Sequence, residues 1–119
     1  MFANARVWCV VGDVMNASKV ASRLGPKLAS RGKEVWSVNP SSKTVESEHL
    51  KRSILDIPVE IEVVNLCIHP AVGAQVVQEA AELGVKSIFI QPGASSEDIL
   101  KICDEASMTV HEGCVLREL

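Results

Sequence analysis

Short apolar runs alternate with longer segments of helical periodicity along this whole chain, and that alternation constrains the fold more than any other feature. The apolar runs occupy residues 6–11, 34–38, 61–68, 86–90 and 108–110. Uninterrupted runs of this length are typical of strands buried on both faces, as in a parallel sheet. The chain is therefore expected to build a sheet whose two faces are both covered.

The segments between the runs suit helices and loops. Residues 17–31 predict an amphipathic helix, with Pro26 as the cause of either a kink or a later start. The other expected elements are a helix from Pro70 to Gly84, one capped by Ser95 or Ser96 that runs through Cys103, a short helix at 50–57, an edge strand near Val45 and a tail over 111–119. Alternating strands and helices predict right-handed β-α-β units. We expect one α/β domain over residues 1–119, a Rossmann-like doubly wound parallel sheet of about five strands in three α/β/α layers.

The composition is that of a globular domain and argues against several classes of protein. Apolar residues make up 47% of the 119 residues and charged residues 23%, which suits one core and its surface. The net charge of -3, the scattered cations and the scarcity of aromatic residues argue against a nucleic-acid binder. No signal peptide or long apolar span is present, and the four cysteines form no C-x-x-C pair. We expect a cytoplasmic protein without membrane segment, structural metal or nucleic-acid partner.

The loops after the predicted strands hold the candidate functional residues, because ligands of such sheets bind beyond the carboxyl ends of the strands. Gly12 ends the first apolar run and would allow a sharp turn with free backbone N–H groups at a helix start, which attracts phosphate. The same stretch also fits an ordinary turn capped by Asn16 or Ser18. The dinucleotide-binding pattern G-x-G-x-x-G is absent, because only one glycine is present here.

The end of the second predicted strand argues against NAD. An NAD-binding fold usually carries Asp or Glu there to hold the ribose hydroxyls. This chain has Asn39 and Pro40 instead, followed by two serines and Lys43. These residues permit a phosphorylated ribose with Lys43 as its cation, although a surface loop with a solvated lysine fits as well.

Three further loops carry polar or reactive side chains. His69 could contact a ligand or act as an acid or base, but no triad pattern surrounds it, and strand-end histidines have many structural uses. Gln91 can donate and accept hydrogen bonds, and Gly93 would let the backbone approach a ligand or simply make a turn. Cys114 is suggestive as a thiol, yet single cysteines are more often inert.

These stretches together resemble the CoA-binding domain family of small bacterial proteins, which is related to the N-terminal CoA domain of the succinyl-CoA synthetase alpha subunit. The resemblance is carried, in order, by residues 10–12, 37–40, 63–70, 88–93 and the end through Cys114. It implies a CoA site made of Gly12, Asp13, Val14, Asn16, Ser18, Asn39, Pro40, Lys43, Ile68, Pro70, Gln91 and Gly93. The chain differs from the family's common pattern at Val14 and at His69.

The resemblance implies a module that binds coenzyme A or an acyl-CoA, without evident catalysis of its own. The phospho-histidine domain and ligase partner of the synthetase are missing from the sequence, so that reaction is not carried over. Two alternatives stay open. One is an enzyme acting on an acyl-CoA through His69 or Cys114, and the other is a protein that senses NAD(P) or another nucleotide in the same cleft.

Overall fold

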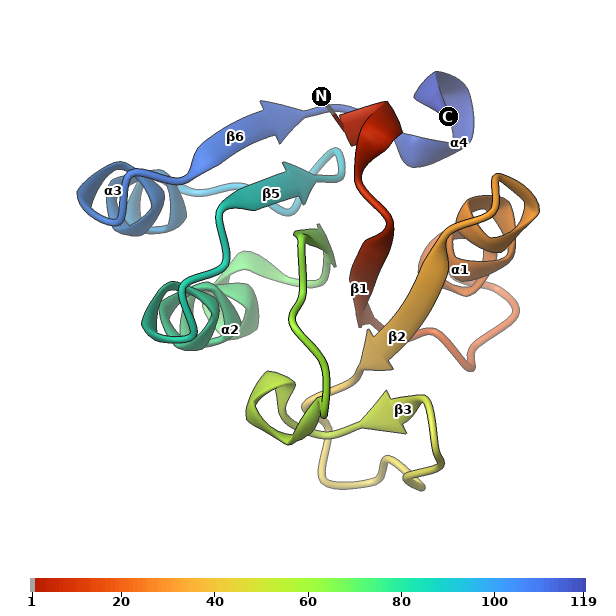
Figure 1. The fold of residues 1–119 in the computed structure, drawn as a ribbon. Helices are drawn as coiled ribbons and strands as arrows, with labels where there is room; N and C mark the ends of the chain where they lie inside the picture. Colours follow the sequence, from red (N-terminus) through yellow and green to blue (C-terminus); the bar gives the residue numbers. More distant parts are fainter. Residues whose placement is uncertain (1) are drawn as a thin grey trace.

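The computed structural model describes residues 2–119 and arranges six strands of them in one parallel sheet (Figure 1). The strands are β1 (Val7–Gly12), β2 (Glu34–Val38), β3 (Leu50–Lys51), β4 (Val63–Cys67), β5 (Ser87–Ile90) and β6 (Thr109–Glu112). Their order is β3-β2-β1-β4-β5-β6, and every neighbouring pair is parallel. This is the strand order of doubly wound Rossmann sheets. The predicted fold is confirmed, with one strand more than the five or so expected.

Helices cover both faces of the sheet (Figure 1). The elements are α1 (Ala21–Ser30), α2 (Pro70–Glu82), α3 (Glu97–Glu105) and α4 (Val115–Glu118), with single 3₁₀ turns η1 (Phe2–Asn4) and η2 (Ile54–Asp56). Side chains of α2, α3 and η2 pack into the core cluster on one face, and those of α1, α4 and η1 into the cluster on the other. The predicted three layers are therefore present.

Strand β1 shows why the apolar runs are continuous. Cys9 and Val11 face α2 and α3, whereas Trp8 and Val10 face α1 and α4. All four side chains are fully buried. A central strand between two helical layers has no solvent face, so both of its side-chain sets must be apolar.

Helix α1 begins four residues later than the sequence predicted, which agrees with the later start that Pro26 suggested. Residues 13–20 form successive turns instead, with the amide of Asn16 bonded to the carbonyl of Asp13 and that of Lys19 to Asn16. The side chain of Asn16 accepts hydrogen bonds from the amide and hydroxyl of Ser18. Asn16 and Ser18 therefore close a local turn rather than cap the helix.

The predictions for the sheet's edge and for the C-terminal tail were wrong. The edge strand is β3, and Val45 lies 84% exposed in the loop before it. Only the three residues of η2 are helical within 50–57, because Leu50 pairs with Ser37 of β2 and is buried. The expected tail is ordered as the end of β6 followed by α4, whose Val115 is fully buried.

Candidate ligand-binding site

The carboxyl edge of the sheet has a pocket at the point where the chain switches faces. Strands β1 and β4 are neighbours, and the helices that follow them, α1 and α2, lie on opposite faces. A crevice at this position is where doubly wound sheets bind ligands. It has a volume of about 500 Å³ and is lined by the loops after β1, β4 and β5 and by the leading turn of α1. Four predicted site residues line this switch-point pocket: Asp13, Ile68, Pro70 and Gly93.

Gly12 has a packing role that the sequence did not reveal. Its φ is not positive, so glycine is not required for the turn. A Cβ at Gly12 would instead lie closer than 3.0 Å to the backbone carbonyl oxygen of Cys67 and 3.0 Å from the Cβ of Ala21. Gly12 is buried and lets β1, β4 and α1 meet at the base of the crevice. It therefore shapes the pocket from below.

Asp13 ties two of the predicted loops together. Its carboxylate accepts a hydrogen bond from Asn16 Nδ2 at 3.1 Å and one from Asn39 Nδ2 at 3.4 Å. Asn39 Oδ1 in turn accepts from the amide of Ser41. The loop after β1 is thus held against the loop after β2. The amides of Val14 and Met15, next in the chain, have no backbone acceptor within residues 2–119.

A second pocket, of about 590 Å³, lies beside the end of β2, and we call it the β2-edge pocket. Of the predicted site residues, Asp13, Asn39 and Lys43 line it. Met15 and Val45, 79% and 84% exposed, form apolar parts of its wall. Because Asp13 borders this pocket and the switch-point pocket alike, the two adjoin along the carboxyl edge.

His69 lines the switch-point pocket and also begins α2. Its Nδ1 accepts a hydrogen bond from the amide of Ala71 at 3.2 Å, so the imidazole acts as the side-chain cap of that helix. Capping satisfies an otherwise free N–H of the first turn. This is one of the structural uses that the sequence left open for His69.

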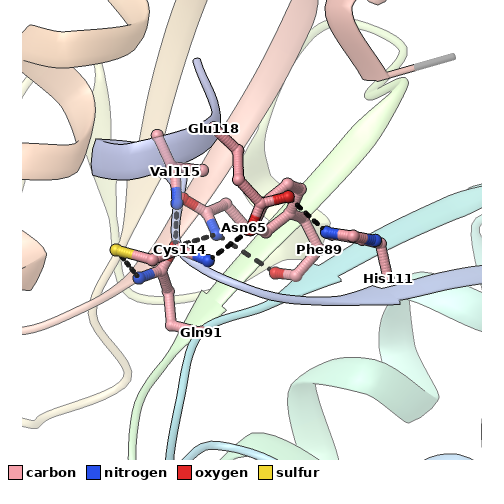
Figure 2. A network of polar contacts seen from close by, with 7 residues as sticks. All are labelled: Asn65, Phe89, Gln91, His111, Cys114, Val115 and Glu118. Carbon is pink, nitrogen blue, oxygen red and sulfur yellow. Dashed lines mark hydrogen bonds and ion pairs between the residues drawn. The ribbon is translucent and has the colours of Figure 1, made fainter.

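Gln91 belongs to a buried polar network instead of the pocket wall (Figure 2). Its side chain is 3% exposed, and Oε1 accepts hydrogen bonds from the amide of Val115 at 2.9 Å and from Asn65 Nδ2 at 3.4 Å. Its Nε2 donates to the sulfur of Cys114 at 3.4 Å. Asn65 Nδ2 also donates to the carbonyl of Phe89. The network fastens α4 to the central strands.

Cys114 precedes α4 within this network. Burial raises the pKa of its thiol, but the hydrogen bond from Gln91, together with the nearby donor groups of Leu116 and Arg117, outweighs it, so that the pKa is lowered overall. The amide of Cys114 donates to Glu118 Oε2, and Glu118 Oε1 lies 2.5 Å from His111 Nε2 (Figure 2). His111 is therefore engaged with a carboxylate and not with the thiol.

The remaining predicted residues lie near the pockets without lining these two. Val14 borders a neighbouring hollow between α1 and the β2–β3 loop. Asn16 and Ser18 hold the loop after β1, and Pro40 follows Asn39. The sequence analysis missed Lys19, Met15, Val45 and Cys67 as lining residues. Lys19 carried the one usable signal, a cation beside a predicted helix start, whereas exposed apolar loop residues give none.

Electrostatically, the pocket region contains both signs of charge. Lys19, Lys43 and Asp13 are all exposed, and neither lysine forms an ion pair with a described residue. No group of three or more His, Cys, Asp or Glu side chains within residues 2–119 is placed to hold a metal ion. Nor does that part of the chain contain a helix long and apolar enough to cross a membrane.

The sheet order and the pocket at its switch point define a Rossmann-like α/β domain with a ligand-sized crevice. Comparison with family models makes this more specific, because the model described as a CoA binding domain matches residues 6–119. The chain belongs to this CoA-binding domain family.

Solved structures show the same fold. A hypothetical protein from Pyrococcus horikoshii is 28% identical with a TM-score of 0.87, covering 97% of this chain and 82% of that one. A conserved hypothetical protein from Pyrococcus furiosus is 33% identical with a TM-score of 0.82, covering 96% and 99% of the two chains. Both are similar to this chain over nearly its whole length.

A larger protein contains the same fold as one part. The dinucleotide-forming acetyl-coenzyme A synthetase 1 of Candidatus Korarchaeum cryptofilum is 20% identical with a TM-score of 0.74, and the match covers 92% of this chain but 26% of that one. At this identity the likeness concerns the fold alone. Comparison with curated proteins gives no match.

Proposed function

We propose that this protein binds coenzyme A, or an acyl-CoA, along the carboxyl edge of its sheet. The observation that carries the proposal is the adjoining pair of pockets in a member of the CoA-binding domain family. CoA is a long ligand with a nucleotide at one end and a flexible thiol arm at the other. In the proposed arrangement the 3′-phosphate end lies in the β2-edge pocket, and the arm lies in the switch-point pocket.

The end of β2 favours CoA over NAD. Asn39 stands where a carboxylate would hold the ribose hydroxyls of NAD, and its amide is already committed to Asp13 and Ser41. Lys43 is exposed on the loop beyond it and lines the β2-edge pocket. A lysine in this position can pair with the 3′-phosphate that CoA has and NAD lacks.

The loop after β1 supplies donors for the pyrophosphate. The amides of Val14 and Met15 have no backbone acceptor in the described part of the chain, and Lys19 brings a positive charge to the same crevice. Asp13 is negative and would repel phosphate, so we assign it the role of holding the loop through Asn16 and Asn39. Gly12 is assigned to the packing beneath the loop.

The binding function that we propose involves no acid–base catalysis. His69 Nδ1 is occupied as a helix cap, and the Cys114 thiol accepts from Gln91, so neither is paired with the other member of a nucleophile–base set. The proposal places the protein in the cytoplasm, where thiols stay reduced, in line with its four unpaired cysteines.

Isothermal titration calorimetry with CoA, dephospho-CoA and NAD tests the proposal. We expect the affinity to fall in that order, with Lys43 responsible for much of the first step. An exposed lysine–phosphate contact contributes about 1 kcal/mol, or roughly fivefold in Kd, and less at high salt. Lys43→Ala should therefore lower CoA affinity about fivefold and leave dephospho-CoA nearly unchanged.

The matched control is Lys101→Ala, because Lys101 is an exposed lysine on α3, away from both pockets. It should leave all three affinities as they are. NAD binding as tight as CoA binding would defeat the ligand assignment. An equal loss for CoA and dephospho-CoA in Lys43→Ala would mean that this lysine does not face the 3′-phosphate.

A further inference from the structure

Two thiols lie on the same side of the sheet, on either side of Gln91. Cys67 ends β4 and is half-buried against the core cluster on the α1 and α4 face, and it also lines the switch-point pocket. Gln91 follows the register pair Leu66–Ile90, so it stands next to Cys67, one residue beyond the end of β5. The thiol of Cys114 is 3.4 Å from Gln91 Nε2. The proposed function uses neither thiol.

The orientation of the Gln91 amide is fixed by its partners. The amide of Val115 can only donate, and it points at Oε1 from 2.9 Å. Asn65 Nδ2 donates to the same oxygen. The NH₂ group of Gln91 is therefore forced toward Cys114, whose sulfur must accept (Figure 2). A thiolate accepts a hydrogen bond better than a thiol does, so the network favours the nucleophilic form of Cys114.

The two thiols differ in reactivity. Burial raises the pKa of Cys67, and the neighbouring charge of Cys114 raises it further, whereas the pKa of Cys114 is lowered. Geometry brings the two thiols to one side chain, because Cys67 lies beside Gln91 in the β4–β5 register and Gln91 Nε2 bonds the sulfur of Cys114. Asn65 Oδ1, fully buried in the same network, has no hydrogen-bond partner among residues 2–119, so one acceptor in this cluster is still open. An activated thiol beside a second, protonated one is the arrangement of an attacking and a resolving cysteine.

We propose that Cys114 and Cys67 form a thiol–disulfide exchange site that reacts with disulfides of the CoA thiol. The proposal rests on the proposed function, because Cys67 belongs to the wall of the pocket assigned to the thiol arm. Cys114 is the attacking thiol, Cys67 is the resolving thiol, and Gln91 positions and activates Cys114.

The chemistry balances with CoA disulfide as the oxidant. The Cys114 thiolate attacks one sulfur of CoA disulfide, the S–S bond breaks, and one CoA leaves as a thiolate that takes a proton from water. Cys67 loses its proton to solvent and attacks the Cys114 sulfur of the mixed disulfide, which expels the second CoA. The protein gains a Cys67–Cys114 disulfide, and one CoA disulfide is reduced to two CoA.

The test uses the full chain, reduced beforehand and mixed with CoA disulfide without air, and reads the intact mass under non-reducing conditions. Wild type should lose two hydrogens and release two CoA per chain. Cys67→Ser should stop with one CoA attached, and Cys114→Ser, which keeps an oxygen acceptor for Gln91, should take none. Cys103→Ala is the control, since Cys103 is buried in α3, and it should behave as wild type. Peptide mapping of quenched wild type should find the first adduct on Cys114 without any substitution.

Three outcomes would overturn the proposal: unmodified wild type, a first adduct on another cysteine, or full reaction by Cys114→Ser. Calorimetry with reduced CoA separates the two proposals. If wild type binds CoA but does not react, exchange fails and the binding function stands. If wild type does not bind CoA, hydroxyethyl disulfide serves as the probe. Rapid formation of the intrachain disulfide would then support the pair of reactive cysteines but reject CoA disulfide as its substrate. If hydroxyethyl disulfide did not react either, both the exchange site and its substrate would be rejected.

Discussion

Replacing Gln91 with leucine should destabilise the protein, although the two side chains are of similar size. The change removes the acceptor of the Val115 amide, which has no other among residues 2–119, and Val115 is fully buried. Asn65 Nδ2 keeps its bond to the carbonyl of Phe89, so it is not left unpaired. A buried donor without a partner costs about 1–3 kcal/mol. The added apolar burial of leucine offsets part of this, and we expect a net loss of about 2 kcal/mol.

Urea unfolding followed by circular dichroism measures this loss. With a slope of about 1–3 kcal/mol per molar urea, the midpoint should fall by roughly 1 M with the slope unchanged. Gln78→Leu on the exposed side of α2 is the matched control and should stay within about 0.5 kcal/mol of wild type. Equal stability of the two variants would refute the reasoning, because Val115 would then not depend on Gln91.

Two further perturbations test the packing of the site and the attachment of α4. Gly12→Ala should destabilise the protein by about 2–3 kcal/mol in the same urea assay, since the new Cβ would meet the backbone carbonyl of Cys67. The control is Gly25→Ala in α1, where the new Cβ makes an ordinary 3.5 Å contact and should stabilise the protein by about 0.5–1 kcal/mol. Similar effects at both glycines would contradict the packing role of Gly12. The amide of Cys114 and the ring of His111 lower the pKa of Glu118 below its ordinary value of 4.5. The stability that ionised Glu118 contributes is present above its pKa in the unfolded chain and is lost as pH falls through its lower pKa in the folded protein. Wild type should therefore lose more stability than Glu118→Gln between about pH 5 and pH 3. Parallel pH curves would show that α4 does not depend on this carboxylate.

The sequence predicted the central part of the fold well because burial on both faces leaves a strong local signal. The run around Trp8 is apolar at every position that meets a helix layer, and within β4 the run around Val64 is interrupted by one polar residue, the buried Asn65. The edge gave no such signal. In β3 only two residues pair with β2, and of these Leu50 is buried and Lys51 half-buried, a pattern too short for periodicity to detect.

The C-terminal residues show a second limit of sequence reading. Helix α4 has four residues, too few for a helical repeat, and it is held by contacts from far along the chain. The amide of Val115 bonds to Gln91, and Phe89 packs 4.8 Å from the ring of His111. Tertiary contacts of this kind decide the structure of a segment whose own propensity is weak.

The predicted site residues fall into two groups, buried residues that hold the fold and exposed residues that are open to a ligand. Gly12 and Gln91 stood out in the sequence as unusual residues at strand ends, and in the structure both are buried and serve the junction of strands with α1 and α4. Lys43 stood out less and is exposed beside a pocket, free of ion pairs with described residues. A buried polar residue must satisfy its own hydrogen bonds first, while an exposed loop residue can keep its groups open for a ligand. Substitutions at Gly12 and Gln91 should therefore act on stability before affinity, and ligand selectivity should follow the loops that these two residues hold in place.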